Sequence, residues 1–179
     1  MPIDEIVLPF TKPETEWVRG RALQKLSPTY SHSRVQSCLV AALNAWAGDR
    51  GRAGTEWRFR IAPGRELRRP LVPDVSYVTM ERLRSVPRED IECPAFAPDV
   101  VVEVLLPGDD PRDVADKIDV YLGAGAKLVA EIDPRLRRAR LYDGAPAIEF
   151  GERDVLRHPV LPGFELPLGV FFSEALDLP

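Results

Sequence analysis

Cysteine is scarce in this sequence of 179 residues, since Cys38 and Cys93 are its two thiols and no CxxC spacing occurs. The scarcity excludes a disulfide framework, and the lack of paired Cys and His spacings excludes the usual zinc sites. We therefore expect a reducing, cytoplasmic setting in which both thiols are ordinary packing residues.

Long apolar runs are also absent. No stretch approaches the roughly 20 residues that a membrane-spanning helix needs. The opening residues, "MPIDEIVLPF", contain neither the basic segment nor the long apolar segment of a secretory signal. The sequence thus predicts no association with a membrane.

Several motifs of common enzymes are missing as well. The sequence has no glycine-rich phosphate loop, no dinucleotide fingerprint and no GxSxG nucleophile motif. Neither internal repeats nor low-complexity linkers divide the chain, so its length predicts a single domain over residues 1–179. Residues 1–25 are predicted to be an irregular N-terminal segment, with a short helix or a hairpin as the alternatives.

The charges that are present are segregated along the chain, although the net charge is only −4. Residues 50–70 hold seven arginines against two acids, and residues 135–140 hold four arginines and no acid. Residues 89–119 hold ten acids against two basic residues. Carboxylates that bind Mg²⁺ and arginines that bind phosphate would give this distribution, and so would an ordinary solvated surface.

The hydrophobic pattern predicts a mixture of helices and strands. Apolar residues recur at helical spacing over 30–46. A second helix begins at Pro111 with Asp110 as its N-cap, and ends at Gly123 or Gly125. Strands are predicted at 55–62, 70–78, 99–106, 126–133 and 137–144, and an extended tail at 161–172. This order indicates an α/β fold with a mixed central β-sheet flanked by helices.

Glu103 is the residue that this fold alone does not explain. It lies among four valines in the 99–106 strand, which is apolar on both faces and therefore predicted to be central in the sheet. A buried carboxylate costs several kcal/mol unless it is paired, hydrogen-bonded or bound to a cation. Asp74 lies near the start of the 70–78 strand, and Lys117 lies on the helix that follows Glu103. All three side chains are candidates for one site.

Two carboxylates and a lysine are the groups that metal-dependent phosphodiester hydrolysis needs. Asp and Glu oxygens hold Mg²⁺, which polarises the phosphate and lowers the pKa of a bound water. The lysine orients that water or stabilises charge. A structural alternative fits the same residues, in which Glu103 forms a buried ion pair with Lys117 or with an arginine.

A resemblance to a known family favours the first interpretation. The segments "SPTYSHSRVQSCLVAAL", "PLVPDVSYV", "APDVVVEVLLP", "IDPRLRRARLYDG" and "LPGFELPL" occur in the order found in the Uma-two family, from about Leu26 to Phe172. These are restriction-endonuclease-like proteins within the PD-(D/E)XK nuclease superfamily. The resemblance implies a restriction-endonuclease-like core, dependence on Mg²⁺ (or Mn²⁺) and DNA as the substrate.

The family motif assigns roles to the three candidate residues. Asp74 in "VPDVSYV" matches the motif aspartate and Glu103 in "PDVVVEVL" matches the motif glutamate, which implies that both hold the metal. The superfamily's usual lysine two positions later is absent, because Leu105 stands there. The resemblance implies that Lys117 replaces it. The sequence also departs from the family at Leu106, Leu128 and Ala130, where a serine, an acid and a tryptophan are common.

Four further polar residues have competing interpretations. His32 lies in a family motif and is either part of the site or a capping or packing residue. Asp113, four residues before Lys117, is predicted to orient that lysine through an ion pair. Glu56 is predicted to pair with neighbouring arginines rather than bind a metal. Asp99 also follows a proline, and is predicted to fix the start of its strand.

The leading prediction is therefore a Mg²⁺-dependent DNA endonuclease of one domain. The alternative is a catalytically inactive module of the same fold that binds nucleic acid or protein. Related nucleases pair two active sites about a twofold axis to cut duplex DNA, so the resemblance also implies a homodimer. We further predict that Asp74 and Glu103 lie on neighbouring strands, close enough to share a cation.

Overall fold

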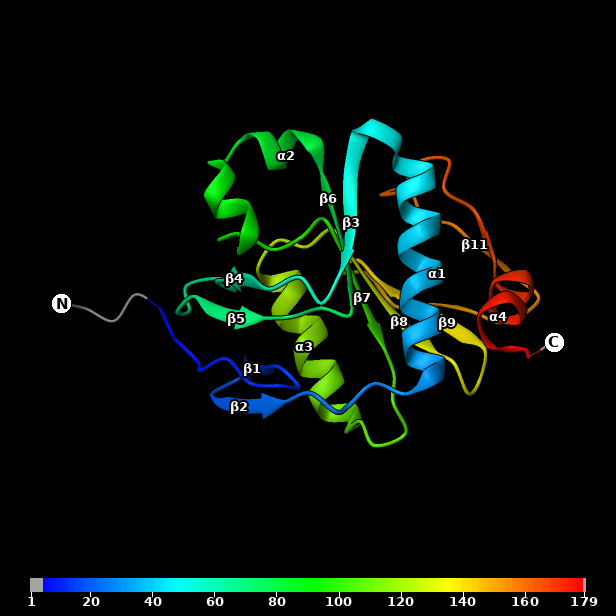
Figure 1. The fold of residues 1–179 in the computed structure, drawn as a ribbon, viewed down its shortest axis with the longest axis horizontal. Helices are drawn as coiled ribbons and strands as arrows, with labels where there is room; N and C mark the ends of the chain where they lie inside the picture. The colour runs from blue at the N-terminus through cyan, green and yellow to red at the C-terminus, as the bar shows by residue number, and fades with distance from the viewer. Residues whose placement is uncertain (1–4, 179) are drawn as a thin grey trace.

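A mixed six-stranded sheet forms the centre of the protein, whose computed structural model describes residues 5–178 (Figure 1). Its spatial order is β10 (Ile148–Phe150), β9 (Arg138–Tyr142), β8 (Leu128–Asp133), β7 (Val100–Val104), β6 (Val75–Thr79) and β3 (Gly51–Thr55). β7 and β8 run parallel, and the other neighbours run antiparallel. The predicted mixed α/β class is confirmed.

Helices and short two-stranded ribbons surround this sheet. The helices are α1 (Tyr30–Ala47), α2 (Met80–Arg84), α3 (Pro111–Gly123) and α4 (Leu168–Leu176), with 3₁₀ turns η1 (Gly48–Arg50) and η2 (Arg88–Glu92). The ribbons are β1 (Thr15–Val18) with β2 (Arg21–Gln24), β4 (Phe59–Ile61) with β5 (Arg69–Leu71), and β11 (Val155–Leu156) with β12 (Leu166–Pro167). No helix among the described residues has both the length and the apolar character needed to cross a bilayer.

The two faces of the sheet carry separate hydrophobic cores. α1 and α4 cover one face, whereas α3 and the β1–β2 and β4–β5 ribbons cover the other (Figure 1). Alternate residues of β7 divide between them, because successive side chains of a strand point to opposite faces. Val100, Val102 and Val104 belong to the first core, and Val101 belongs to the second. Glu103 therefore faces α3, on the same side as Val101.

The two predicted long helices are present with the expected ends. α1 begins after Thr29, whose side chain accepts a hydrogen bond from the His32 amide, and ends before Gly48 at φ 53°. α3 begins after Asp110, whose side chain accepts from the Arg112 amide, and has Pro111 in its first turn. Both helices were predictable because their caps are local signals.

Two predicted strands are wrong in the same way, since each is broken in the middle. The 55–62 strand divides at Glu56, which has a φ of 51°, so that β3 and β4 belong to different sheets. The 70–78 strand divides between Leu71 and Val75, into β5 and β6. Asp74 consequently lies at the corner before β6, where the chain passes from a ribbon to the central sheet.

The two ends of the chain also differ from the expectation of irregular or extended structure. Residues 168–176 form α4, whose buried residues Leu168, Phe171, Phe172 and Ala175 have helical spacing. Near the N-terminus, the hairpin alternative holds. β1 and β2 are joined by Arg19 and Gly20, which have φ values of 41° and 85° as a two-residue hairpin turn requires.

Candidate active site

The pairing of β6 with β7 brings Asp74 and Glu103 together. Its antiparallel register sets Val75 opposite Val102, and continuing it by one residue sets Asp74 opposite Glu103. Residues directly opposite each other project from the same face of a sheet. The Val104 amide, next to Glu103, donates a 2.7 Å hydrogen bond to Asp74 Oδ2. The two carboxylates therefore lie on neighbouring strand segments and on one face.

Helix α3 carries Lys117 to this pair. Lys117 Nζ lies 2.6 Å from Glu103 Oε2 and 2.9 Å from Glu16 Oε2. All three side chains are buried. The lysine thus contacts Glu103 from the helix that follows the Glu103 strand, and the two residues belong to one cluster.

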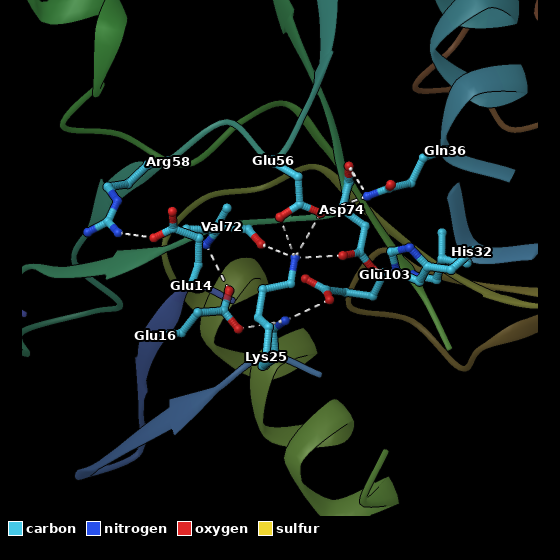
Figure 2. A network of polar contacts seen from close by, with 12 residues as sticks. Glu14, Glu16, Lys25, His32, Gln36, Glu56, Arg58, Val72, Asp74 and Glu103 are labelled. Carbon is cyan, nitrogen blue, oxygen red and sulfur yellow. Dashed lines mark hydrogen bonds and ion pairs between the residues drawn. The ribbon is translucent and has the colours of Figure 1, made fainter. Parts of the chain in front are cut away.

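The β1–β2 hairpin contributes two residues that sequence reasoning missed, Glu16 and Lys25 (Figure 2). Lys25 Nζ lies 2.6 Å from Asp74 Oδ1, and Glu16 Oε1 accepts a 2.8 Å hydrogen bond from the Val72 amide. Glu16 has a signal in the sequence. It lies two residues before Val18, and residues two apart in a strand point to the same face, so both side chains face inward. Lys25 has none, since its location depends on how the hairpin docks.

Helix α1 closes the opposite side of the cluster. His32 Nε2 lies 3.2 Å from Asp74 Oδ2, and Gln36 donates to the Asp74 carbonyl at 3.1 Å. An ionised carboxylate only accepts hydrogen bonds, so Nε2 must carry the proton of the His32 ring. Of the two interpretations of His32, the structure thus favours a location in the site.

Two of the predicted ion pairs are wrong. Asp113 pairs with Arg21 of β2 rather than with Lys117, because the lysine points into the protein and Asp113 faces the hairpin. Glu56 pairs with Lys25 at 3.1 Å and accepts from Gln36 at 2.7 Å, instead of pairing with neighbouring arginines. The break at Glu56 turns its side chain toward the cluster.

A substitution of Asp113 therefore tests whether this residue acts through Arg21 or through Lys117. We expect Asp113→Asn to change the free energy of unfolding by less than about 0.5 kcal/mol, because partly exposed ion pairs contribute little and Arg21 keeps a second partner, Asp116, at 3.6 Å. Urea denaturation measures this, and a metal titration should give an unchanged affinity. A tenfold weaker metal affinity would instead support the original prediction that Asp113 orients Lys117.

Five of the eleven arginines in the arginine-rich segments form close ion pairs with acids. Contacts of this kind are Arg58 with Glu14, Arg60 with Glu5, Arg69 with Glu66, Arg137 with Glu152 and Asp177, and Arg140 with Glu149. The guanidinium groups of these five arginines are thus engaged within the fold, whereas no ion pair is formed by Arg50, Arg65 or Arg68 among the described residues.

The polar cluster opens into a cavity of about 690 Å³. Asp74, Glu103, Lys117, Lys25 and His32 all line it, and the loop that precedes α3 forms another wall. Cavities of several hundred Å³ are typical of sites for small ligands. The buried charges are therefore accessible from solvent through this opening.

The charges of the cluster shift the pKa values of Glu103 and Lys117 in the same direction. Burial raises the pKa of Glu103 from 4.5 to about 8, outweighing Lys117, and the nearby Asp74 and Glu16 raise it further. Burial alone would lower the pKa of Lys117, but Glu103 and Glu16 outweigh it and raise that pKa. Both shifts follow from an excess of negative charge in a place with little water. The ammonium proton stays on Lys117, and Glu103 is the group that takes up the next proton.

Asp74 behaves in the opposite way. Burial would raise its pKa, but Lys25 and the hydrogen bond from His32 outweigh burial and hold the pKa of Asp74 below its usual range. Lys25 has a raised pKa, because the attraction of Asp74 outweighs the effect of burial. Asp74 and Lys25 thus form a stable ion pair, whereas Glu103 is the strained member of the cluster.

The oxygens that remain free decide whether the cluster suits a divalent cation. Glu103 Oε1 is buried and accepts no well-formed hydrogen bond within residues 5–178, although the buried Tyr121 hydroxyl lies close enough for Glu103 to raise the pKa of Tyr121. Three donors, from Lys25, His32 and Val104, occupy Asp74, which leaves one of the roughly four acceptor positions of a carboxylate. No three His, Cys, Asp or Glu side chains converge as a metal site in this part of the chain. Mg²⁺ needs only one or two carboxylates, since it keeps several waters, so the pair fits it.

Comparisons with known proteins identify the family and the fold. The sequence matches the Uma2 family, described as "Putative restriction endonuclease", over residues 6–169. The chain belongs to the Uma2 family. A crystal structure described as "a putative nuclease belonging to DUF820", from Anabaena variabilis ATCC 29413, superposes with a TM-score of 0.83 and 26% sequence identity. The match covers 94% of this chain and 95% of the other. No curated protein sequence matches this chain.

Membership of the Uma2 family confirms the resemblance found in the sequence and the restriction-endonuclease-like fold. It also supports a nuclease-like function. The chain nevertheless lacks the usual lysine two residues after Glu103, since Leu105 stands there, and the ammonium next to Glu103 comes from α3.

Proposed function

We propose that this chain is a divalent-metal-dependent endonuclease that hydrolyses phosphodiester bonds of DNA. Asp74 and Glu103 would hold Mg²⁺ or Mn²⁺, and Lys117 would assist from α3. The proposal rests on membership of the Uma2 family and on one observation of the site. A fully buried carboxylate oxygen, Glu103 Oε1, lies unpartnered among the described residues, beside Asp74 in a solvent-accessible cavity.

That oxygen is costly in a protein that only binds a partner through its surface. A buried acceptor without a hydrogen bond costs about 1–3 kcal/mol, and more when it is charged. Four carboxylates, those of Glu16, Glu56, Asp74 and Glu103, share two ammonium groups, so the cluster carries two negative charges once Glu103 gives up its proton. One divalent cation would neutralise them. The catalytically inactive alternative offers no reason to keep this arrangement.

The residues of the chain have distinct parts in this function. A cation held there would supply Lewis acidity and stabilise charge on the phosphate. Lys117 stays protonated beside Glu103 and Glu16, so it acts as a hydrogen-bond donor and positive charge rather than as a base. His32 donates to Asp74 and orients that carboxylate.

Cleavage of supercoiled plasmid DNA tests the proposal, because a closed circle has no ends and reports only endonuclease activity. We expect nicked or linear products with millimolar Mg²⁺ or Mn²⁺ and none with EDTA. Asp74→Asn should lower the cleavage rate by at least about 100-fold, since even indirect partners of metal ligands are worth 10–100-fold.

Asp99→Asn is the matched control. Asp99 is also a buried aspartate that follows a proline, but it accepts from the Thr79 amide and pairs with Arg82 and Lys127, away from the cavity. We expect it to lower stability while cleavage per folded protein persists. No cleavage of any DNA with either metal would favour the inactive binding module. Equal cleavage by wild type and Asp74→Asn would show that this site does not carry the activity.

A further inference from the structure

Lys25 is surrounded by oxygens in a way that an ordinary ion pair does not require. Its Nζ lies 2.6 Å from Asp74 Oδ1, 2.9 Å from the Val72 carbonyl, and 3.1 and 3.3 Å from the two oxygens of Glu56 (Figure 2). The side chain is only 13% exposed. Two carboxylates and a backbone carbonyl are the kind of ligands that hard divalent cations take. We call these three groups, from Glu56, Asp74 and Val72, the oxygen cradle.

The cradle is assembled by parts of the protein other than the hairpin that delivers Lys25. Gln36 of α1 donates to Glu56 Oε1 at 2.7 Å and to the Asp74 carbonyl at 3.1 Å, so it fixes both acidic residues relative to each other. The Glu56 amide donates to the Asp74 carbonyl at 3.3 Å. Glu56 also has a positive φ of 51°, which is unfavourable for a residue with a side chain. The fold thus holds the cradle in place, and Lys25 enters it from a separate ribbon.

The charge of the cluster indicates how many further cations it accepts. With Lys25 and Lys117 in place and Glu103 ionised, its four carboxylates retain two negative charges, which match one divalent ion. A second divalent ion would leave two net positive charges in a buried place, whereas without Lys25 the same two ions would leave only one. Among the carboxylate oxygens of the cluster in the described residues, Glu103 Oε1 is the buried one without a hydrogen-bond partner and is therefore open to the first ion, whereas the oxygens of the cradle already contact an ammonium.

We propose that the oxygen cradle is a second cation position that Lys25 fills with its own ammonium group. The protein then takes one divalent ion, at Glu103 and Asp74, and Lys25 is a positioning residue that replaces a second ion. The single-ion part rests on the proposed function. The cradle itself does not, because it predicts that a neutral residue at position 25 opens a site for one additional ion.

Counting bound Mn²⁺ on the full chain tests this directly, by calorimetric titration and by metal analysis after free ions are removed. We expect one Mn²⁺ per chain for wild type and two for Lys25→Met. The double variant Lys25→Met/Glu56→Gln should return to one, because it removes a carboxylate of the cradle. Glu56→Gln alone should bind one, like wild type.

The difference between Lys25→Met and wild type separates this inference from the proposed function. Equal counts in the two proteins overturn the cradle, even if wild type cleaves DNA. If wild type binds no Mn²⁺ and Lys25→Met binds one, the cradle stands and the metal-dependent nuclease fails. If Lys25→Met folds only with Mn²⁺, the ions are counted on the refolded protein. Failure to fold at any Mn²⁺ concentration overturns the inference, because a cation must be able to replace the ammonium.

Discussion

Glu103→Gln should abolish metal-dependent cleavage while leaving the metal-free protein at least as stable as wild type. The loss of a proposed metal ligand should lower the cleavage rate by at least about 100-fold. The stability result follows from the contacts of Lys117. That lysine keeps Glu16 at 2.9 Å, so neutralising Glu103 does not leave a buried ammonium alone. The amide oxygen of glutamine also accepts a hydrogen bond from Lys117.

The pH dependence of the free energy of unfolding shows whether Glu103→Gln stabilises or destabilises the metal-free protein. The pKa of Glu103 is raised from 4.5 to about 8 in the folded protein. Between these values the folded state holds a proton that the unfolded state has lost. The contribution of Glu103 to stability is therefore present below about pH 4.5 and is lost as the pH rises through about 8.

Glutamine does not titrate, so the two proteins should differ most at high pH. We expect Glu103→Gln to exceed wild type by about 1–3 kcal/mol near pH 8 and to equal it near pH 5, without added metal. Urea denaturation at both pH values, in EDTA, measures this. A large loss of stability at pH 8 together with normal Mn²⁺ binding would identify Glu103 as half of a structural ion pair.

The local parts of this site could be predicted from the sequence. A glutamate among valines is conspicuous because apolar neighbours on both faces predict burial, and β7 is buried along its whole length. Lys117 was identifiable because α3 has a clear N-cap at Asp110 and a regular apolar stripe, which together define the direction of its side chains. Asp74 required the family motif, since an acid near the start of a strand is common.

The non-local parts could not be predicted. Lys25 and Glu16 reach the cluster because the β1–β2 hairpin docks on α3, where Arg19 and Arg21 pair with Asp119 and Asp113. Nothing in a window of a few residues specifies that docking. The same docking explains the error at Asp113, since an i,i+4 spacing on a helix favours an ion pair only when both side chains face solvent.

Breaks within strands are the other source of error. "TEWRFRIA" alternates throughout, yet Glu56 adopts a positive φ and ends β3. The alternation remains true of β4, where Phe59 and Ile61 are buried. The hydrophobic pattern predicts which side of the chain is buried. It does not predict to which sheet a strand belongs, so it stays correct when the chain passes from one sheet to another. The corner at Glu56 and the corner at Asp74 are the positions that bring their carboxylates to Lys25.

Lys117→Met should produce the opposite result to Glu103→Gln, a strong loss of stability. It leaves Glu103 and Glu16 facing each other without a cation, and both carboxylates are buried. Removing one partner of a buried charge network costs about 3–5 kcal/mol. We expect a loss of this size at pH 8 in urea denaturation without metal. The loss should shrink as the pH falls toward 5, because Glu103 then takes up a proton.

Lys127→Met is the matched control for this change. Lys127 also pairs with a buried aspartate, Asp99 at 2.9 Å, but its own side chain is 58% exposed and Asp99 keeps Arg82. We expect a loss of less than about 1 kcal/mol. A similar small loss for Lys117→Met would mean that water enters the cluster and screens its charges.

A compensating variant separates lost charge from lost packing. In Lys117→Met/Glu16→Gln/Glu103→Gln, Lys117 and both of its ion-pair partners are replaced by neutral residues. The new amide at position 16 can still accept from the Val72 amide that Glu16 Oε1 now serves. We expect this protein to recover most of the stability that Lys117→Met loses, and to remain inactive. The opposite effects that we expect for Lys117→Met and Glu103→Gln on stability have one cause. Lys117 has two carboxylate partners and tolerates the loss of one, whereas Glu103 has no cation other than Lys117 within hydrogen-bond distance among the described residues, until a metal ion binds.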